Sequence, residues 1–383
     1  MIQTRRNCVT TGIYHRKEIS SVLQLRLLAL TGIIVSLAAC NGSSGGYVSP
    51  TPLPTASPVP GSIGTLNTIA TIGSTVDLGT GSGAGDNNPY GLTIAPLTVG
   101  LETAGDLIVC NFSNSANQNG AGTTIEDLKP TPGSLPTRIA QSASLAGCNA
   151  LAINAANGAI WAADYTANNN PIVSSSGSII TTLSQNTWNG PWGQAFNGDY
   201  GGKNAFFETN AKNGTVTRIN IAAGPTFSFD TILTGLTYNN GVPGNILAPA
   251  GLSYDVKSDT LYVVDSNANR VIAIHQATSA PANTYAATGN TFTSPNVAIV
   301  FSGTPLAAPI SSALLSNGDL VVGNTTNNLL VEINPATGTI VATKSVDSGL
   351  AGAIFGVAAE SVGGQQYVYF NDDNSNTVDR LGP

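Results

Sequence analysis

Histidine and charged residues are scarce in this sequence. Two histidines, His15 and His275, occur among 383 residues, and only 9% of the residues are Asp, Glu, Lys or Arg. A zinc site built from several histidines is therefore excluded by count. A Ser-His-Asp triad in the chain beyond the N-terminal segment would have to use His275, and no nucleophile-elbow motif surrounds it. We interpret His275 as a surface residue at the end of a strand.

Basic residues are few beyond position 39. Nine Lys and Arg remain there against 20 Asp and Glu, so that part of the chain has a net charge near −11. Phosphate backbones need a basic surface to neutralise them, and a negative field repels them. The sequence therefore predicts no nucleic-acid partner.

Turn-forming and β-branched residues are abundant instead. The chain is 42% hydrophobic and contains 43 glycines, and its apolar residues show no long run with a 3.6-residue period. A chain of this composition can bury a large core, which a disordered chain cannot. Together these features predict an all-β extracytoplasmic protein.

The N-terminus is typical of an export signal. Five basic residues precede an apolar run over residues 27–39, which is too short to span a membrane stably. The run ends in Leu37-Ala38-Ala39-Cys40, which resembles the bacterial lipobox. The resemblance implies a lipoprotein signal peptide over residues 1–39 and a lipid anchor on Cys40 that attaches the protein to a membrane. An ordinary secretory signal with a chance cysteine is the alternative.

The polar residues after Cys40 predict a tether and a location. Residues 40–61 are rich in Pro, Ser and Gly and read as a semi-extended linker to a domain over residues 62–383. Asn41 is not Asp, and the lipoprotein sorting pattern then implies the outer membrane of a bacterial cell envelope. We expect the domain to be extracytoplasmic.

Six similar segments recur along that domain. Each consists of a small-residue strand, a β-branched or aromatic strand, and a turn rich in Asp or Asn. The first strands begin at Pro89, Cys148, Pro191, Pro249, Pro309 and Ile354. The spacing fits one four-stranded sheet per repeat, with insertions at residues 120–145 and 275–294 that we expect in rim loops.

The fourth segment carries a family resemblance. Residues 263–271, which read Val-Val-Asp-Ser-Asn-Ala-Asn-Arg-Val, follow Pro249-Ala250-Gly251-Leu252 and resemble the NHL repeat. The resemblance implies a six-bladed β-propeller with four-stranded blades, whereas a solenoid is the alternative fold. The sixth repeat ends after its third strand, and residues 65–72 form an unassigned β run. We predict that this N-terminal run closes the ring as the outer strand of blade six.

Two cysteines, Cys110 and Cys148, remain beyond position 40. Cys110 ends a strand of the first repeat and Cys148 begins the second repeat. In an oxidising compartment a disulfide between them is possible, and two buried free thiols are the alternative.

The sequence offers few residues for a functional site. Calcium-dependent lactonases of the gluconolactonase type share the propeller fold and bind metal through carboxylate and amide oxygens at the channel mouth, so calcium is possible. Oxygen-bearing residues near strand ends are Asn88, Asn149, Asn189, Asp164, Glu208 and Asp265. Turn formation is the favoured explanation of these positions, because Asn and Asp are ordinary turn formers, and no cluster has metal-loop spacing. We therefore assign no metal ligand and no catalytic residue.

Two tryptophans flank a Gly-Pro turn. Trp192 occupies the aromatic position of its repeat and is expected in the core, whereas Trp188 has no equivalent in the other repeats. An exposed aromatic residue on a loop can stack on a sugar or a partner protein. We therefore place a possible binding surface at Trp188 with Asn88, Asn149 and Asn189.

Three functions are open from the sequence. The main hypothesis is a surface-anchored, non-catalytic binding or scaffolding propeller for a protein or glycan partner, because no catalytic constellation is visible. The alternative is a calcium-assisted lactonase-like hydrolase that uses the central channel. A purely structural envelope component is the third.

Overall fold

The computed structural model describes residues 61–198, 200–224 and 226–383. Cys40, the export signal and nearly all of the tether lie outside the described residues and stay predictions. Within the described part, 26 strands account for almost all regular structure, and the helices are four short 3₁₀ turns. None of the described helices has the length and apolarity needed to cross a membrane.

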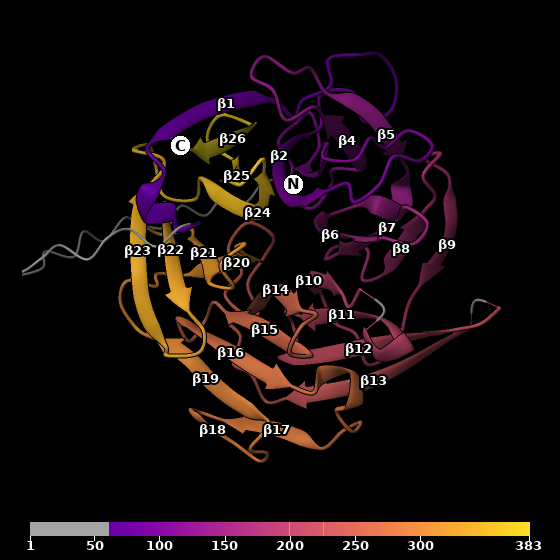
Figure 1. The fold of residues 1–383 in the computed structure, drawn as a ribbon. Coiled ribbons are helices and arrows are strands. Elements are labelled where there is room, and N and C mark those ends of the chain that lie inside the picture. Colours follow the sequence, from indigo (N-terminus) through magenta and orange to yellow (C-terminus); the bar gives the residue numbers. More distant parts are fainter. Residues whose placement is uncertain (1–60, 199, 225) are drawn as a thin grey trace, which may run out of the picture. The chain divides into compact units, whose positions relative to one another are not determined.

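The strands form six sheets arranged as the blades of a propeller, with the innermost strand of each blade facing a common centre (Figure 1). Within each blade four antiparallel strands follow one another from the centre outward. Blade one contains β2 (Asn87–Ile94), β3 (Leu107–Ser113), β4 (Thr124–Leu128) and β5 (Thr137–Gln141). Blade two contains β6 (Cys148–Asn154), β7 (Ala159–Asp164), β8 (Asn170–Val173) and β9 (Ile179–Leu183). Blade three contains β10 (Pro191–Phe196), β11 (Asn204–Asn210), β12 (Thr215–Ala222) and β13 (Thr226–Thr234).

Blades four to six complete the ring. Blade four contains β14 (Pro249–Asp255), β15 (Thr260–Asp265), β16 (Arg270–His275) and β19 (Val297–Ser302). Blade five contains β20 (Pro309–Leu314), β21 (Leu320–Asn324), β22 (Leu329–Asn334) and β23 (Thr339–Ser345). Blade six contains β24 (Ile354–Val362), β25 (Gln365–Asp372), β26 (Thr377–Gly382) and β1 (Thr68–Ser74). The 3₁₀ turns are η1 (Ile63–Thr65), η2 (Ala143–Leu145), η3 (Tyr200–Gly202) and η4 (Ala277–Ser279).

The predicted six-bladed propeller is confirmed, including its closure by an N-terminal strand. β1 pairs antiparallel with β26, from Thr68 opposite Gly382 to Ser74 opposite Thr377. Figure 1 shows β1 on the outer side of β26, so the first and last described strands share one blade. Without β1, the backbone groups of β26 would form an unpaired edge.

The two predicted insertions differ from the rim loops that we expected. The first contains η2 and the two outer strands of blade one, β4 and β5, because four strands per blade need that length of chain. The second contains η4 and a small hairpin of β17 (Tyr285–Thr288) and β18 (Thr291–Phe292). β17 pairs in parallel with β13, so this insertion extends the sheet of blade three.

Alternating side chains hold neighbouring blades together. Successive residues of a strand point to opposite faces of its sheet. Phe206 of β11 therefore stacks on Trp161 of blade two, with ring centroids 3.9 Å apart. The next residue, Phe207, packs against Tyr254 of blade four at 5.5 Å. Each blade thus contributes apolar side chains to two interfaces, and the core is distributed between the blades.

Candidate functional site

The six inner strands enclose a central channel. β2, β6, β10, β14, β20 and β24 contact one another around the ring, and the cavities between them are lined by residues of all six. We call the end where these strands begin the upper mouth, which is lined by Tyr90, Trp192 and Phe355. A cavity of about 270 Å³ lies there, above a waist of about 60 Å³ and a lower cavity of about 300 Å³.

The waist is narrow because backbone segments approach one another closely. A Cβ atom on Gly193 of β10 would lie 2.1 Å from the carbonyl oxygen of Ala250 on β14. A Cβ atom on Gly91 of β2 would lie 2.6 Å from Cys110 Sγ. Only glycine allows such approaches, which explains why the repeat needs a small residue at this position.

The upper mouth has an aromatic wall. The ring centroids of Tyr90 and Phe355 lie 3.6 Å apart in a stacked arrangement, and Trp192 lies 6.1 Å from Tyr90. These residues follow the first residue of the repeat in blades one, three and six, so the repeat brings them together at the axis. Residues 244–247, 325–326 and 351–352 also line this cavity, and among them Asn245, Thr325 and Thr326 have polar side chains. An aromatic surface with a few polar side chains beside it suits a small ring compound.

One carboxyl group lies beside this wall. Asp373, in the turn between β25 and β26, is partly exposed and contacts the side chain of Asn88 from blade one. Asn88 donates from its amide nitrogen to that carboxylate and accepts from Ser113 Oγ at 3.0 Å. Burial, with a smaller contribution from the charge of Asp372, raises the pKa of Asp373 to about 7.

Asp373 also acts on the aromatic wall. Burial raises the pKa of Tyr90, the charge of Asp373 adds to this rise, and hydrogen bonding with Asn88 opposes it. The Tyr90 hydroxyl therefore stays protonated and can donate a hydrogen bond. A carboxyl group that is about half ionised at neutral pH is suited to accept and return a proton. The upper mouth thus combines a proton carrier, a hydrogen-bond donor and an apolar wall.

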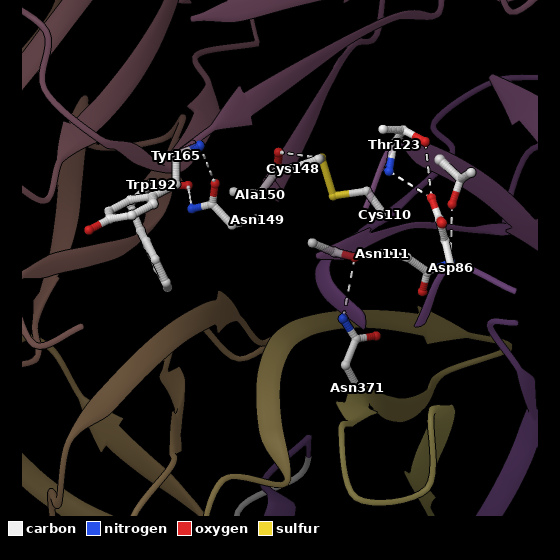
Figure 2. Close-up of a disulfide and its surroundings, with 12 residues drawn as sticks. Asp86, Cys110, Asn111, Thr123, Cys148, Asn149, Ala150, Tyr165, Trp192 and Asn371 are labelled. Atoms are coloured by element: carbon white, nitrogen blue, oxygen red, sulfur yellow. Dashed lines mark hydrogen bonds between the residues drawn. A yellow bond between two sulfur atoms is a disulfide. The ribbon is translucent and has the colours of Figure 1, made fainter. Parts of the chain in front are cut away.

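The predicted binding asparagines have different positions. Asn88 lies at the upper mouth, with a left-handed backbone (φ 64°). Asn149 bridges two blades: its Nδ2 donates to the carbonyl oxygen of Trp192 at 3.1 Å, and its Oδ1 accepts from the backbone N–H of Tyr165 at 3.2 Å (Figure 2). Asn189 is exposed, and its backbone N–H donates to Asn210 Oδ1 at 3.2 Å. The structure therefore does not bring the three together.

The expectation that Trp188 is exposed on a rim is wrong. Its side chain is 3% exposed and packs edge-on against Phe229 of β13 at 5.4 Å, in a cluster with Phe206 and Ile219. The strand β13 is long and brings Phe229 over the loop that carries Trp188. The residue has a packing position, and we assign it no contact with a ligand.

Replacing Trp188 with alanine should therefore destabilise the protein. Truncation of a buried tryptophan costs about 3 to 5 kcal/mol through lost burial and the cavity left behind. We expect Trp188→Ala to lower the melting temperature markedly, whereas Asn189→Ala, at an exposed neighbour, should leave it nearly unchanged. Equal melting temperatures for the two variants would contradict the packing position.

The two cysteines are joined in a disulfide. Cys110 on β3 and Cys148 on β6 have Cα atoms 5.9 Å apart, and both side chains are fully buried. Figure 2 shows the bond crossing from blade one to blade two, next to Asn149. The bond therefore joins neighbouring blades close to the channel wall. Of the two alternatives left open by the sequence, the structure has the bridge.

The other oxygen-bearing residues do not converge at the upper mouth. Asp265 of blade four pairs with Arg270, with 2.8 Å between Oδ2 and Nε. Asp164 and Glu208 are fully buried in blades two and three. No three His, Cys, Asp or Glu side chains within residues 61–383, leaving aside 199 and 225, group as a metal site. At the upper mouth, within the described residues, Asn88 presents its amide nitrogen to Asp373, so the pair does not form a set of oxygen ligands for calcium.

The residues of the upper mouth were missed in the sequence. Asp373 follows Asp372 in an Asp- and Asn-rich turn, where turn formation accounts for both. Its neighbour Asn88 lies at the other end of the domain, and only ring closure brings them together. The aromatic residue after the first position of the repeat was a visible signal for Tyr90, Trp192 and Phe355.

Several buried carboxyl groups should make stability depend on pH. Burial raises the pKa of Glu102, Asp127 and Asp373 to about 7, and that of Glu208 to about 8. Between pH 5 and 8 the folded protein therefore holds protons that the unfolded chain has released, so stability falls as pH rises.

We expect the protein, treated with a chelator so that metal ions do not bind its carboxylates, to melt several degrees higher at pH 5.5 than at pH 8. Glu102→Gln should reduce this difference, because Glu102 is 1% exposed and both of its carboxylate oxygens lack a hydrogen-bond partner among the described residues. A melting temperature that rises between pH 5.5 and 8 would contradict the prediction that stability falls as the pH rises.

Fold and channel together define a six-bladed β-propeller. No protein-family model and no curated protein sequence matches the chain. A gluconolactonase from Xanthomonas campestris shares the fold at 10% identity, with 82% of this chain and 89% of that chain covered and a TM-score of 0.54. Virginiamycin B lyase from Staphylococcus aureus does so at 12% identity, covering 82% and 99%, with a TM-score of 0.51. A putative gluconolactonase does so at 9% identity, covering 82% and 91%, with a TM-score of 0.51.

These comparisons correct the main hypothesis about function. The sequence showed no catalytic constellation, and we concluded that the propeller only binds or scaffolds. That hypothesis is corrected by this comparison, because these three solved structures, which share the fold, are named as a lyase and gluconolactonases. The NHL-repeat resemblance holds at the level of the propeller fold.

Proposed function

We propose that the protein is a hydrolase that opens small cyclic esters (lactones) at the upper mouth of its channel. One observation carries the proposal: Asp373, whose pKa is about 7, contacts Asn88 and lies close enough to Tyr90 of the aromatic wall for its charge to raise the pKa of the Tyr90 hydroxyl. The likeness of the fold to gluconolactonases supports the reaction class. The cavity of about 270 Å³ lies just below the usual volume range of ligand pockets, which favours a small ring.

The reaction needs one proton carrier. The ring lies against Phe355 and Trp192, with its carbonyl oxygen accepting a hydrogen bond from the Tyr90 hydroxyl. Asp373 in its ionised form removes a proton from a water molecule as the water oxygen bonds to the carbonyl carbon. The ring C–O bond then breaks, and Asp373 returns the proton to the released oxygen. The product is an open hydroxy acid, and Asp373 is ionised again.

The rest of the site positions these groups. Asn88 donates to the Asp373 carboxylate, and the backbone N–H of Asp373 donates to the carbonyl oxygen of Ala353 at 2.8 Å, which fixes the turn against β24. Tyr90 is held between Phe355 and Phe112, whose ring centroid lies 4.2 Å away. The groups therefore occupy fixed positions before a substrate arrives, which lowers the cost of orienting them.

The proposal is tested with a panel of lactones. Four-carbon to six-carbon ring lactones, with and without apolar side chains, are incubated with the purified protein, and acid release is followed with a pH indicator. We expect turnover above the spontaneous rate for at least one small lactone, inhibited competitively by the matching cyclic ether, which lacks the carbonyl group. Absence of turnover across the whole panel would overturn the proposed function.

A further inference from the structure

A second group of polar side chains lies between blades two and three, away from the upper mouth. Its centre is Glu208 of β11, which is 0% exposed. Around it lie Asn170 at the start of β8, which is also 0% exposed, and Gln194 of β10, which is 6% exposed. None of these residues takes part in the chemistry proposed for Asp373. Burying a carboxyl group is costly unless another group compensates for it.

Both amides donate to one oxygen of this carboxyl group. Asn170 Nδ2 lies 2.6 Å and Gln194 Nε2 lies 3.4 Å from Glu208 Oε2. The other carboxylate oxygen, Oε1, has no hydrogen-bond partner among the described residues, and neither do Asn170 Oδ1 and Gln194 Oε1. Each of these two oxygens belongs to the same side-chain amide group as a nitrogen that donates to Glu208. Three buried oxygens without a donor are therefore gathered around one carboxyl group.

A second carboxyl group lies in the same region. Asp164 at the end of β7 is 0% exposed, and its Oδ1 also lacks a partner in the described part of the chain. Burial raises the pKa of Asp164, and the charge of Glu208 adds to the rise. The three arginines that form ion pairs within the described residues, Arg138, Arg218 and Arg270, pair with other acids. Neither Asp164 nor Glu208 thus has a basic side chain to balance its charge.

Protonation alone does not satisfy this group. A proton on Glu208 Oε1 would neutralise that carboxyl group and could be donated to one neighbouring oxygen, but the remaining unpaired oxygens of the group would still have no partner. Oxygens that face no donor are the ligands that hard cations take, and two carboxylates balance a divalent charge. A cation would satisfy the unpaired oxygens and the charge at once.

The channel gives an ion access to this group. Gln194 lines both the waist and the lower cavity of about 300 Å³. Its side chain therefore stands between the buried carboxyl group and the open end of the channel. An ion entering from below meets Gln194 first and Glu208 behind it.

We propose that Glu208, Gln194 and Asn170, together with Asp164, form a buried binding site for calcium in the wall between blades two and three. The site is separate from the upper mouth and does not depend on the proposed hydrolase function. It ties strands of blade two to strands of blade three, so its occupation stabilises the interface between them.

Calcium binding is measured by its effect on melting and by calorimetry. The purified protein is stripped with a chelator, dialysed at pH 8, and titrated with calcium chloride. At about 100 times the dissociation constant, we expect the melting temperature to rise by about 5 °C. Glu208→Gln, which keeps the shape of the side chain, should weaken binding at least about tenfold and thereby remove about half of the rise or more. Glu360→Gln, at an acid on the last blade, is the matched control and should keep the full response.

Three outcomes would overturn the site. They are the absence of any calcium effect on the wild type, an equal calcium effect in the wild type and Glu208→Gln, and an equal loss in the Glu360→Gln control. If Glu208→Gln does not fold, Gln194→Leu removes the ligand at the channel wall and must lose the response in its place. None of these readouts uses lactone hydrolysis, so failure of this site and failure of the proposed function are distinguishable.

Discussion

A chain that begins at Thr75 should fail to form a stable propeller, whereas one that begins at Gly61 should fold. The shorter chain lacks β1, the outer strand of blade six, and leaves the backbone groups of β26 unpaired. It also lacks Ile63, Leu66 and Ile72, which are at most 2% exposed. Each fully buried apolar side chain contributes about 1.5 to 3 kcal/mol, so their loss approaches the total stability of a typical domain.

The segment before β1 adds a polar anchor to this closure. The backbone N–H of Ile63 donates to Glu332 Oε2 on β22 at 3.0 Å, and Ser62 Oγ donates to the same oxygen. These contacts tie the N-terminal segment to blade five as well as blade six. Thermal melting followed by circular dichroism compares the two chains. Equal melting temperatures would show that β1 is dispensable and that the closure has no energetic role.

Replacing Asp373 with asparagine should lower kcat for lactone opening by about 10²- to 10⁴-fold, the usual contribution of a general base. Asparagine has nearly the same shape but cannot accept the proton of the attacking water. The melting temperature should stay the same or rise slightly, because ionisation of this partly buried carboxyl group is unfavourable. The variant therefore separates catalysis from folding.

Asp255→Asn is the matched control for this variant. Asp255 lies at the end of β14 near the lower mouth, and its carboxylate accepts from the backbone N–H of Lys257 at 3.0 Å, which an asparagine side chain can also do. We expect Asp255→Asn to keep both kcat and KM. Equal activity in Asp373→Asn and the wild type would remove Asp373 from the reaction.

The inner strands could be predicted because their signal is local. Cys148, Pro191, Pro249, Pro309 and Ile354 begin β6, β10, β14, β20 and β24, as the repeat alignment predicts. A first residue that is often proline, a small residue at the close approach and an Asp- or Asn-rich turn occur within about twenty residues of one another. The outer strands of blade one, β4 and β5, carry Glu126, Asp127 and Arg138, and this polar content hid them in a predicted loop.

The site could not be predicted because its contacts are distant in sequence. Asp373 meets Asn88 only after the first and last blades close the ring, and turn formation alone accounts for either residue. Trp188 had the opposite problem. Its position in a polar loop suggested exposure, and only the packing of Phe229 from a later strand shows that it is buried. Sequence patterns therefore predict local structure well. They predict contacts between distant segments only where the repeat fixes those contacts.

The dependence of kcat/KM on pH tests the central claim most directly. Lactone opening by the wild type is followed from pH 5 to 9, with the spontaneous rate subtracted at each pH. We expect kcat/KM to rise with pH and level off, with a midpoint near 7, because Asp373 with a pKa of about 7 must be ionised to accept a proton. In Asp373→Asn this rise should disappear from the residual activity. If kcat/KM of the wild type does not rise with a midpoint near pH 7, or if the variant shows the same rise, the assignment of Asp373 as the proton acceptor is contradicted.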